Sequence, residues 1–206
     1  MKIIFGTTNK RKQMDLQKLS HSLNLDFEIL NMDDIGWNKG EIEENGQTIE
    51  ENAFIKAKAL YDFCHEKGLN YPIITDDTGL FCEALNGDPG LYTARYADDE
   101  MLANKDVPPH QCVIKLLRNL KEKENRRACY RCCVTCILPD GSHFQEFGES
   151  NGVIAKDIVG ELKKPYFYTI FIIDEYQKAF SDLTAEELMN TFRYQTLKKV
   201  LLKLTK

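Results

Sequence analysis

The chain has 206 residues, a formal net charge of −5 and a hydrophobic fraction of 43%. This length suits a single domain with a substantial buried core. No apolar run is long enough to span a membrane, the start lacks a secretory signal pattern, and no basic block indicates a nucleic-acid-binding face. We therefore expect a soluble, cytoplasmic protein that binds neither membranes nor nucleic acids.

Apolar periodicity predicts alternating strands and helices first, followed by consecutive strands. The predicted strands cover residues 2–7, 26–31, 72–76, 127–138, 142–149 and 166–173. The predicted helices cover residues 11–22, 49–66, 110–122 and 184–204. This order predicts an α/β fold with a mixed sheet and flanking helices.

The first strand runs directly into a polar turn, Gly6-Thr-Thr-Asn-Lys-Arg-Lys12, before a helix begins. A helix that starts after such a turn offers backbone N–H groups and a positive dipole end to an anion. The glycine spacing of a P-loop is absent, and a solvated basic turn is the alternative interpretation. The candidate anion ligands are Thr7, Thr8, Asn9, Lys10, Arg11 and Lys12.

The second helix begins with a capping-box pattern, Thr48-Ile-Glu-Glu51. Lys56 lies four residues after Asn52, so the two side chains share a face of this helix. An acidic loop precedes the helix, and its Glu44 is a candidate metal ligand. The alternative is a solvated acidic turn.

A buried apolar run ends in two adjacent carboxylates, Asp76 and Asp77, followed by Thr78 and Gly79. We expect the strand to end there, with Thr78 and Gly79 turning the chain. Mg²⁺ prefers one or two carboxylates together with substrate phosphates, so this end of the strand suits a magnesium site. An Asx turn that caps the strand is the alternative.

Four of the seven cysteines fall between Cys129 and Cys136, with two overlapping C-x-x-C spacings. A structural zinc site is one interpretation of such spacing. The stretch has the composition of a strand, however, and residues three apart on a strand point to opposite faces. We therefore expect small, buried, reduced side chains here.

Taken together, these segments resemble the inosine triphosphate pyrophosphatase (Ham1-like) family. The family opens with Thr-x-Asn-x-x-Lys and an acid three residues later, which Thr7, Asn9, Lys12 and Asp15 match. The further matches are Glu51-Asn-Ala-Phe-Ile-Lys-Ala57, Asp76-Asp-Thr-Gly-Leu80, Ala84-Leu-Asn-Gly-Asp-Pro-Gly90 and Thr93-Ala-Arg-Tyr-Ala97.

The last third departs from the family pattern. The family's Gly-Phe-Gly-Tyr-Asp-Pro-Ile-Phe loop corresponds to Lys164-Pro-Tyr-Phe-Tyr-Thr-Ile-Phe171 here, and the family's Ser-His-Arg corresponds to Thr191-Phe-Arg193. Phe192 thus replaces a histidine, which predicts altered or relaxed base preference. The candidate base-pocket residues are Tyr166, Phe167, Tyr168, Phe192 and Arg193.

The resemblance implies one domain over residues 1–206, an elongated fold of two lobes around a central cleft, and a homodimer. It implies Mg²⁺-dependent hydrolysis of the deaminated purine triphosphates ITP, dITP and XTP to the monophosphate and pyrophosphate. Asp77, Asp76, Lys12 and Lys56 would be catalytic, with Asp77 and Glu44 on the metal and Thr78 at the family's serine position. A shifted nucleotide specificity, or a nucleotide-binding protein without turnover, is the alternative.

Overall fold

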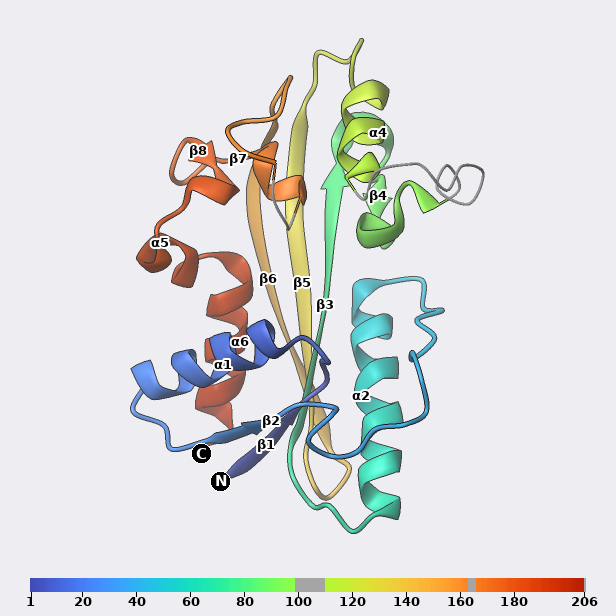
Figure 1. Ribbon diagram of the computed structural model, residues 1–206, viewed down its shortest axis with the longest axis vertical. Coiled ribbons are helices and arrows are strands. Elements are labelled where there is room, and N and C mark those ends of the chain that lie inside the picture. The colour runs from blue at the N-terminus through green and yellow to red at the C-terminus, as the bar shows by residue number, and fades with distance from the viewer. Residues whose placement is uncertain (99–109, 163–165, 206) are drawn as a thin grey trace. The chain divides into compact units, whose positions relative to one another are not determined.

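The computed structural model describes residues 1–98, 110–162 and 166–205, except for the side chains of Arg11 and Tyr166. Its helices are α1 (Lys10–Ser22), α2 (Ile49–Glu66), α4 (Gln111–Asn119), α5 (Ala185–Met189) and α6 (Phe192–Lys203) (Figure 1). Its strands are β1 (Lys2–Phe5), β2 (Glu28–Leu30), β3 (Ile73–Cys82), β4 (Pro89–Gly90), β5 (Arg127–Ile137), β6 (His143–Ile154), β7 (Phe171–Ile173) and β8 (Lys178–Ala179).

The strands form one eight-stranded sheet in the order β2-β1-β3-β5-β6-β7-β8, and β4 pairs with β3. β1 is parallel to both β2 and β3, whereas β7 is antiparallel to both β6 and β8. The predicted mixed α/β sheet with flanking helices is therefore confirmed.

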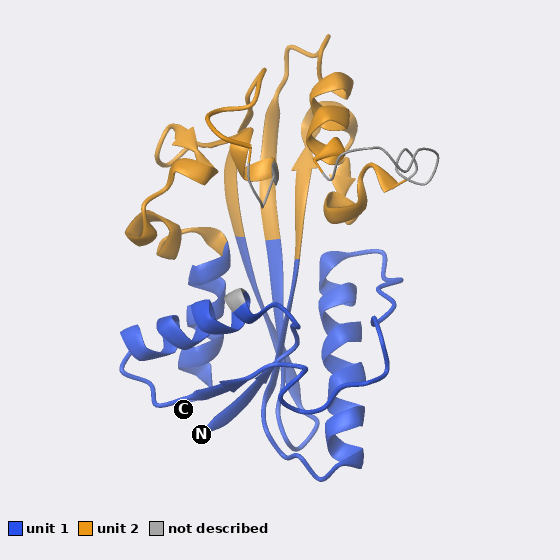
Figure 2. Ribbon diagram, in the orientation of Figure 1, with its two compact units in different colours: residues 1–77, 132–148, 193–206 blue, residues 78–131, 149–192 orange. Residues whose placement is uncertain are grey.

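Contacts between residues divide the chain into two compact units, which Figure 2 shows in different colours. The first unit comprises residues 1–77, 132–148 and 193–206, and the second comprises residues 78–131 and 149–192. β3, β5 and β6 contribute residues to both units. That the whole chain acts as one domain stays a prediction.

In the first unit, helices cover both faces of the sheet, with α1 and α6 on one side and α2 on the other (Figure 1). Successive strand residues point to opposite faces, so β1 divides its apolar side chains between the two layers. Ile3 and Phe5 pack with Leu16 of α1 and Leu197 of α6. Ile4 packs in the other layer, with residues that include Leu60, Phe63 and Cys64 of α2.

The second unit contains a cluster of aromatic rings around Tyr130 of β5. The ring of Phe192 stacks on Tyr130 with a centroid distance of 5.6 Å and an interplanar angle of 11°. The ring of Phe171 meets the same tyrosine edge-on, with a centroid distance of 4.9 Å. The ring centroids of Tyr168 and Phe180 lie 4.2 Å apart. This cluster joins β5, β7 and the segments on either side of α5 in one apolar layer.

The prediction that β3 ends at residue 76 is wrong. The strand continues to Cys82 because it keeps sheet partners: β5 is its neighbour in the sheet, and β4 pairs with its last part, Leu80 opposite Gly90 and Phe81 opposite Pro89. Gly79 therefore lies in the strand rather than in a turn. A Cβ atom on Gly79 would lie 2.7 Å from the carbonyl oxygen of Gly90, so the glycine allows the close approach of β4.

Two other predicted elements are shorter than expected. The helix predicted over 184–204 is interrupted, because Asn190 caps α5 and the Thr191 hydroxyl donates to the Leu188 carbonyl at 2.7 Å. Of the strand predicted over 166–173, only Phe171–Ile173 form a strand, which is β7. Residues Tyr166–Thr169 form a 3₁₀ turn instead.

All seven cysteines are free and buried, which confirms the prediction of buried, reduced side chains. Burial raises the pKa of Cys132 to about 11 and that of Cys136 to about 12. Both thiols are therefore protonated and unreactive at neutral pH.

None of the helices in the described parts of the chain is long and apolar enough to cross a membrane.

Candidate functional site

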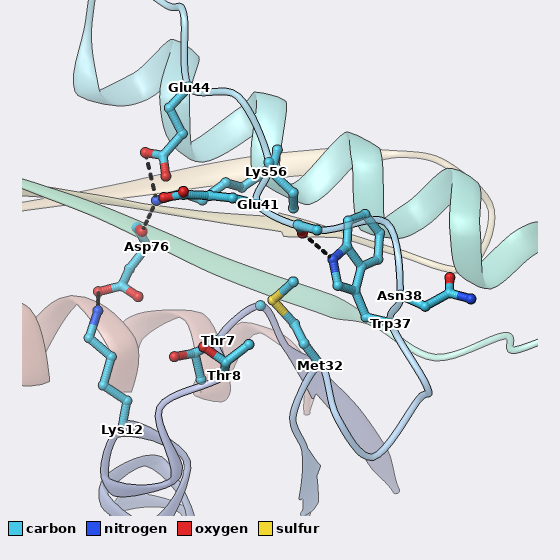
Figure 3. A pocket seen from close by; sticks show the side chains of 13 residues that line it. Thr7, Thr8, Lys12, Met32, Trp37, Asn38, Glu41, Glu44, Lys56 and Asp76 are labelled. Atoms are coloured by element: carbon cyan, nitrogen blue, oxygen red, sulfur yellow. Dashed lines mark hydrogen bonds and ion pairs between the residues drawn. The ribbon is translucent and has the colours of Figure 1, made fainter.

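A pocket of about 680 Å³ opens in the first unit (Figure 3). Its lining combines the β1–α1 turn, the loop that follows β2, and one residue each of α1, α2 and β3. The lining residues are Gly6, Thr7, Thr8, Lys12, Met32, Trp37, Asn38, Gly40, Glu41, Ile42, Glu44, Lys56 and Asp76.

The β1–α1 turn is held by its own polar side chains. The Thr7 hydroxyl accepts a hydrogen bond from Asn9 N at 3.0 Å, and Asn9 Oδ1 accepts one from Lys12 N at 3.4 Å. Asn9 thus caps the start of α1, where backbone N–H groups need acceptors. Thr8 and Lys10 are exposed beside it, whereas the side chain of Arg11 lies outside the described residues.

The two adjacent aspartates of β3 face opposite layers of the first unit, as alternation along a strand requires. Asp76 accepts hydrogen bonds from Lys12 of α1 and Arg193 of α6. Asp77 lies beside Lys56 of α2. The register with β1 ends at Ile74, so both carboxylates come just after β1 stops pairing with β3. At this point Asp76 lines the pocket, and Asp77 lies beside Lys56, another of the lining residues.

Asp76 is a buried carboxylate between two cations. Its side chain is 3% exposed, and its Oδ2 lies 2.8 Å from Arg193 Nε and 3.5 Å from Lys12 Nζ. Burial alone would raise the pKa of Asp76, but Arg193 and then Lys12 outweigh that effect and hold the pKa well below its usual range. Asp76 is therefore a carboxylate at neutral pH.

On the α2 side of the sheet, Lys56 is a buried cation between carboxylates. Its Nζ lies 3.1 Å from Glu44, 3.4 Å from Asp77 and 2.8 Å from the backbone carbonyl of Asp76. Burial alone would lower the pKa of Lys56, but Asp77, Asp76 and Glu44 raise it above its usual value of 10.5. The ammonium is therefore charged, and it is largely enclosed by these oxygens.

The same carboxylates suit a hard cation. Glu44 and Asp77 both approach one point, the position of Lys56 Nζ, from different segments of the first unit. No group of three or more His, Cys, Asp or Glu side chains that could hold a metal occurs among the residues described. Mg²⁺ needs only one or two carboxylates when phosphates and waters complete its shell, so the donor set fits that ion.

One wall of the pocket was not predicted from the sequence. Met32, Trp37 and Ile42 contribute apolar surface from the loop after β2. The indole Nε1 of Trp37 donates to the Gly40 carbonyl at 2.7 Å, and its ring meets Phe63 of α2 edge-on at 5.0 Å. The available signal was that Trp37 is the chain's single tryptophan and lies four residues before Glu41, where the acidic loop begins.

The predicted base-pocket residues are divided between the units. Arg193 lies in the first unit, whereas Phe167, Tyr168 and Phe192 belong to the second, as does Thr78. Phe167 and Phe192 are buried, and the latter stacks within the aromatic cluster. The Thr78 hydroxyl is buried without a hydrogen-bond partner among the described residues. The side chain of Tyr166 lies outside them.

A sequence model of the Ham1 family matches residues 3–202. The chain belongs to the Ham1 family. It is 36% identical over 177 residues to the dITP/XTP pyrophosphatase of Bacillus subtilis, covering 84% of this chain and 83% of the relative. It is 30% identical over 187 residues to the dITP/XTP pyrophosphatase of Clostridium perfringens, covering 90% and 88%.

Solved structures of Ham1 proteins share the fold. The Staphylococcus aureus Ham1 protein superposes with a TM-score of 0.80 at 28% sequence identity, and the match covers the whole of both chains. A Ham1 protein from Coxiella burnetii gives a TM-score of 0.81 at 24% identity over all of this chain and 98% of the other. The family resemblance read from the sequence motifs is therefore confirmed.

Proposed function

We propose that this Ham1-family chain hydrolyses the deaminated purine triphosphates ITP, dITP and XTP to the monophosphate and pyrophosphate. The observation that carries the proposal is the convergence of Glu44, Asp77 and Lys56 beside the β1–α1 turn. The names of the Bacillus and Clostridium relatives, which match most of this chain, support the substrate class.

The chain's own residues suit each part of this reaction. Thr7, Thr8 and Lys12 line the pocket and would bind phosphate oxygens, and Lys56 adds a buried positive charge. Asp77 would bind the metal or accept a proton from the attacking water. The water oxygen bonds to the α-phosphorus, and the anhydride bond to the β-phosphate breaks, which releases pyrophosphate.

Mg²⁺ is the cation that we propose for Glu44 and Asp77. When bound, it would neutralise charge that develops on the phosphate oxygens. The two carboxylates come from separate segments, the loop before α2 and the middle of β3, and both lie in the first unit. The fold of that unit alone therefore supplies the proposed metal ligands.

The first test is pyrophosphate release with Mg²⁺ across ITP, dITP, XTP, GTP, ATP, CTP and UTP. Preference for the deaminated purines supports the proposal. Comparable rates across the panel favour the alternative of relaxed specificity, for which the observation is Phe192 at the family's histidine position. Absence of release with every nucleotide would instead favour a binding protein without turnover.

The second test separates catalysis from binding. Asp77→Asn should still bind dITP and should lose most of its pyrophosphate release. Asp62→Asn is the matched control, because Asp62 pairs with Lys58 on the exposed side of α2, away from the pocket lining. Equal slow release by wild type and Asp77→Asn would refute the catalytic role of Asp77.

We further propose that the chain works as a single domain and as a cytoplasmic homodimer. The passage of β3, β5 and β6 through both compact units supports the first part, since no strand ends at the division. Light scattering of the purified protein would test dimerisation directly.

A further inference from the structure

We propose that Asp76 is a positioning residue, whose carboxylate fixes the side chains of Arg193 and Lys12 for the bound triphosphate. This inference rests on the proposed function and assigns different roles to the two adjacent aspartates. Asp77 would act on the metal or the water, whereas Asp76 would act only through its two cationic partners.

The separation of roles follows from the strand. Neighbouring residues of β3 point to opposite faces, and each aspartate meets cations from its own layer. Thr75 shares the face of Asp77, and its hydroxyl donates to the Ala53 carbonyl of α2 at 2.6 Å. Ile74 shares the face of Asp76 and belongs to the cluster packed against α1 and α6. The position of each carboxylate is therefore fixed by the packing of its neighbours.

Asp76 is poorly suited to proton transfer. It is more deeply buried than Asp77, with 3% against 17% of the side chain exposed. Its Oδ2 accepts hydrogen bonds from both Arg193 and Lys12. An oxygen that already accepts hydrogen bonds from two cationic side chains is not positioned to take a proton from a water.

The same geometry suits a positioning role. When Nε donates a hydrogen bond to a fixed carboxylate, the plane of the guanidinium group is fixed. The N–H groups on its other two nitrogens then point in fixed directions. Arg193 lies at the start of α6 and Lys12 near the start of α1, so a single carboxylate orients cations from two helices. Lys12 and Asp76 both line the pocket.

The sign of the effect makes the inference testable. Removal of a negative charge beside an anion site should strengthen binding of a triphosphate through Coulomb's law alone. Loss of a positioning group should weaken it instead. Asp76→Asn, which retains the side-chain shape, therefore distinguishes the two effects.

The experiment measures dITP binding in EDTA, without metal-dependent turnover, through the fluorescence of Trp37, the single tryptophan in the pocket wall. We expect Asp76→Asn to bind about 10-fold more weakly, a loss of about 1.4 kcal/mol. The double variant Asp76→Asn/Arg193→Gln should lose less affinity than the sum of the two single losses, because both changes remove the Asp76–Arg193 bond and only the contact of Asp76 with Lys12 is lost in addition. Tighter binding by Asp76→Asn, or additive losses in the double variant, would overturn the proposal.

A second readout is the pH profile of kcat/KM with dITP and Mg²⁺. If Asp76 has a positioning role, the acidic limb of the profile should remain in Asp76→Asn. If Asp76 were the general base, the acidic limb should be absent from that variant. Because binding is measured without turnover, failure of the hydrolysis proposal would appear separately, as an inactive wild type that still binds dITP.

Two further variants protect the test against misfolding. Arg193→Lys retains the charge but lacks Nε, so it should bind dITP about as weakly as Arg193→Gln, and wild-type affinity would refute positioning by Asp76. The matched control is Asp174→Asn, which breaks an aspartate–arginine pair with Arg127 on the surface of the second unit. Asp174→Asn should bind dITP as wild type does.

Discussion

Arg193 Nε donates a hydrogen bond of 2.8 Å to Asp76 Oδ2, although the two residues are 117 positions apart in the chain. The bond joins the start of α6 to the middle of β3 inside the first unit. A buried carboxylate of this kind is costly unless it is paired, and the pairing therefore affects stability as well as the site.

Asp76→Asn should lower the free energy of unfolding at neutral pH by about 3–5 kcal/mol, the usual cost of leaving one partner of a buried pair unmatched. The pKa of Asp76 is lower in the folded protein than its ordinary value of 3.8. The stabilisation by the charged form is therefore complete above that value and is lost as the pH falls below it.

Urea unfolding at pH 7, 5 and 3 measures this dependence. The difference between wild type and Asp76→Asn should be the same at pH 7 and pH 5 and smaller at pH 3. A difference that stays constant down to pH 3 would show that Asp76 does not contribute its charge to folding.

Lys56→Met should reduce pyrophosphate release from dITP by about 10²–10³-fold, by analogy with the loss of one preorganised electrostatic donor. The physical reason is that its ammonium lies 3.1 Å from Glu44 Oε2 and 3.4 Å from Asp77 Oδ1. Steady-state kinetics with dITP and Mg²⁺ measures the effect.

Lys58→Met is the matched control on the same helix. Lys58 forms an exposed pair with Asp62 and takes no part in the pocket lining. Its replacement should leave the rate within about twofold, since exposed pairs contribute little. If both variants lost activity equally, the effect would belong to α2 rather than to the site.

Much of the first unit could be predicted from short-range patterns. The strand–turn–helix order, the Thr48 cap of α2 and the adjacent aspartates are all local signals, and Thr48 does accept a hydrogen bond from Glu51 N at 3.1 Å. The other half of that capping box differs, because the Glu51 carboxylate accepts from Gln47 N instead.

Contacts between residues that lie far apart in the chain could not be predicted from the sequence. β3 continues beyond the aspartates as a strand that neighbours β5 in the sheet and pairs with β4, and nothing local to Thr78 and Gly79 signals those partners. The bond between Asp76 and Arg193 likewise depends on how α6 packs in the first unit. Turn propensity was therefore overridden by tertiary pairing.

Phe192→His introduces the histidine expected from the family pattern, at a position that the aromatic cluster encloses. Phe192 is 4% exposed and stacks on Tyr130, so an imidazole there would bury polar nitrogens in an apolar layer. We expect a loss of about 1–3 kcal/mol in the free energy of unfolding. Urea unfolding measures that loss.

The same variant tests base preference. If Phe192 acts mainly in packing, the ratio of kcat/KM for dITP to that for dATP should change less than about threefold in Phe192→His. A rise of tenfold or more would place residue 192 among the groups that select the base. Phe192→Leu serves as the control that loses the ring without adding a donor.

Gly6→Ala tests the packing beneath the β1–α1 turn. A Cβ atom at this position would lie 2.6 Å from Thr75 Cγ2 and 2.7 Å from Leu60 Cδ1, both far inside normal contact. Thr75 and Leu60 are fully buried, so neither can move away freely. Overpacking of this kind typically costs about 1–3 kcal/mol. The displaced turn should also raise KM for dITP, because Thr7 and Thr8 follow directly.

The rescue variant is Gly6→Ala/Thr75→Ser, which removes the closer of the two clashing atoms and retains the hydroxyl that bonds to the Ala53 carbonyl. If the clash is the cause, the double variant should be more stable than the sum of the single changes predicts. Urea unfolding of the four proteins gives this coupling. Strictly additive losses would mean that the contact with Leu60 Cδ1, rather than the contact with Thr75, requires glycine at residue 6.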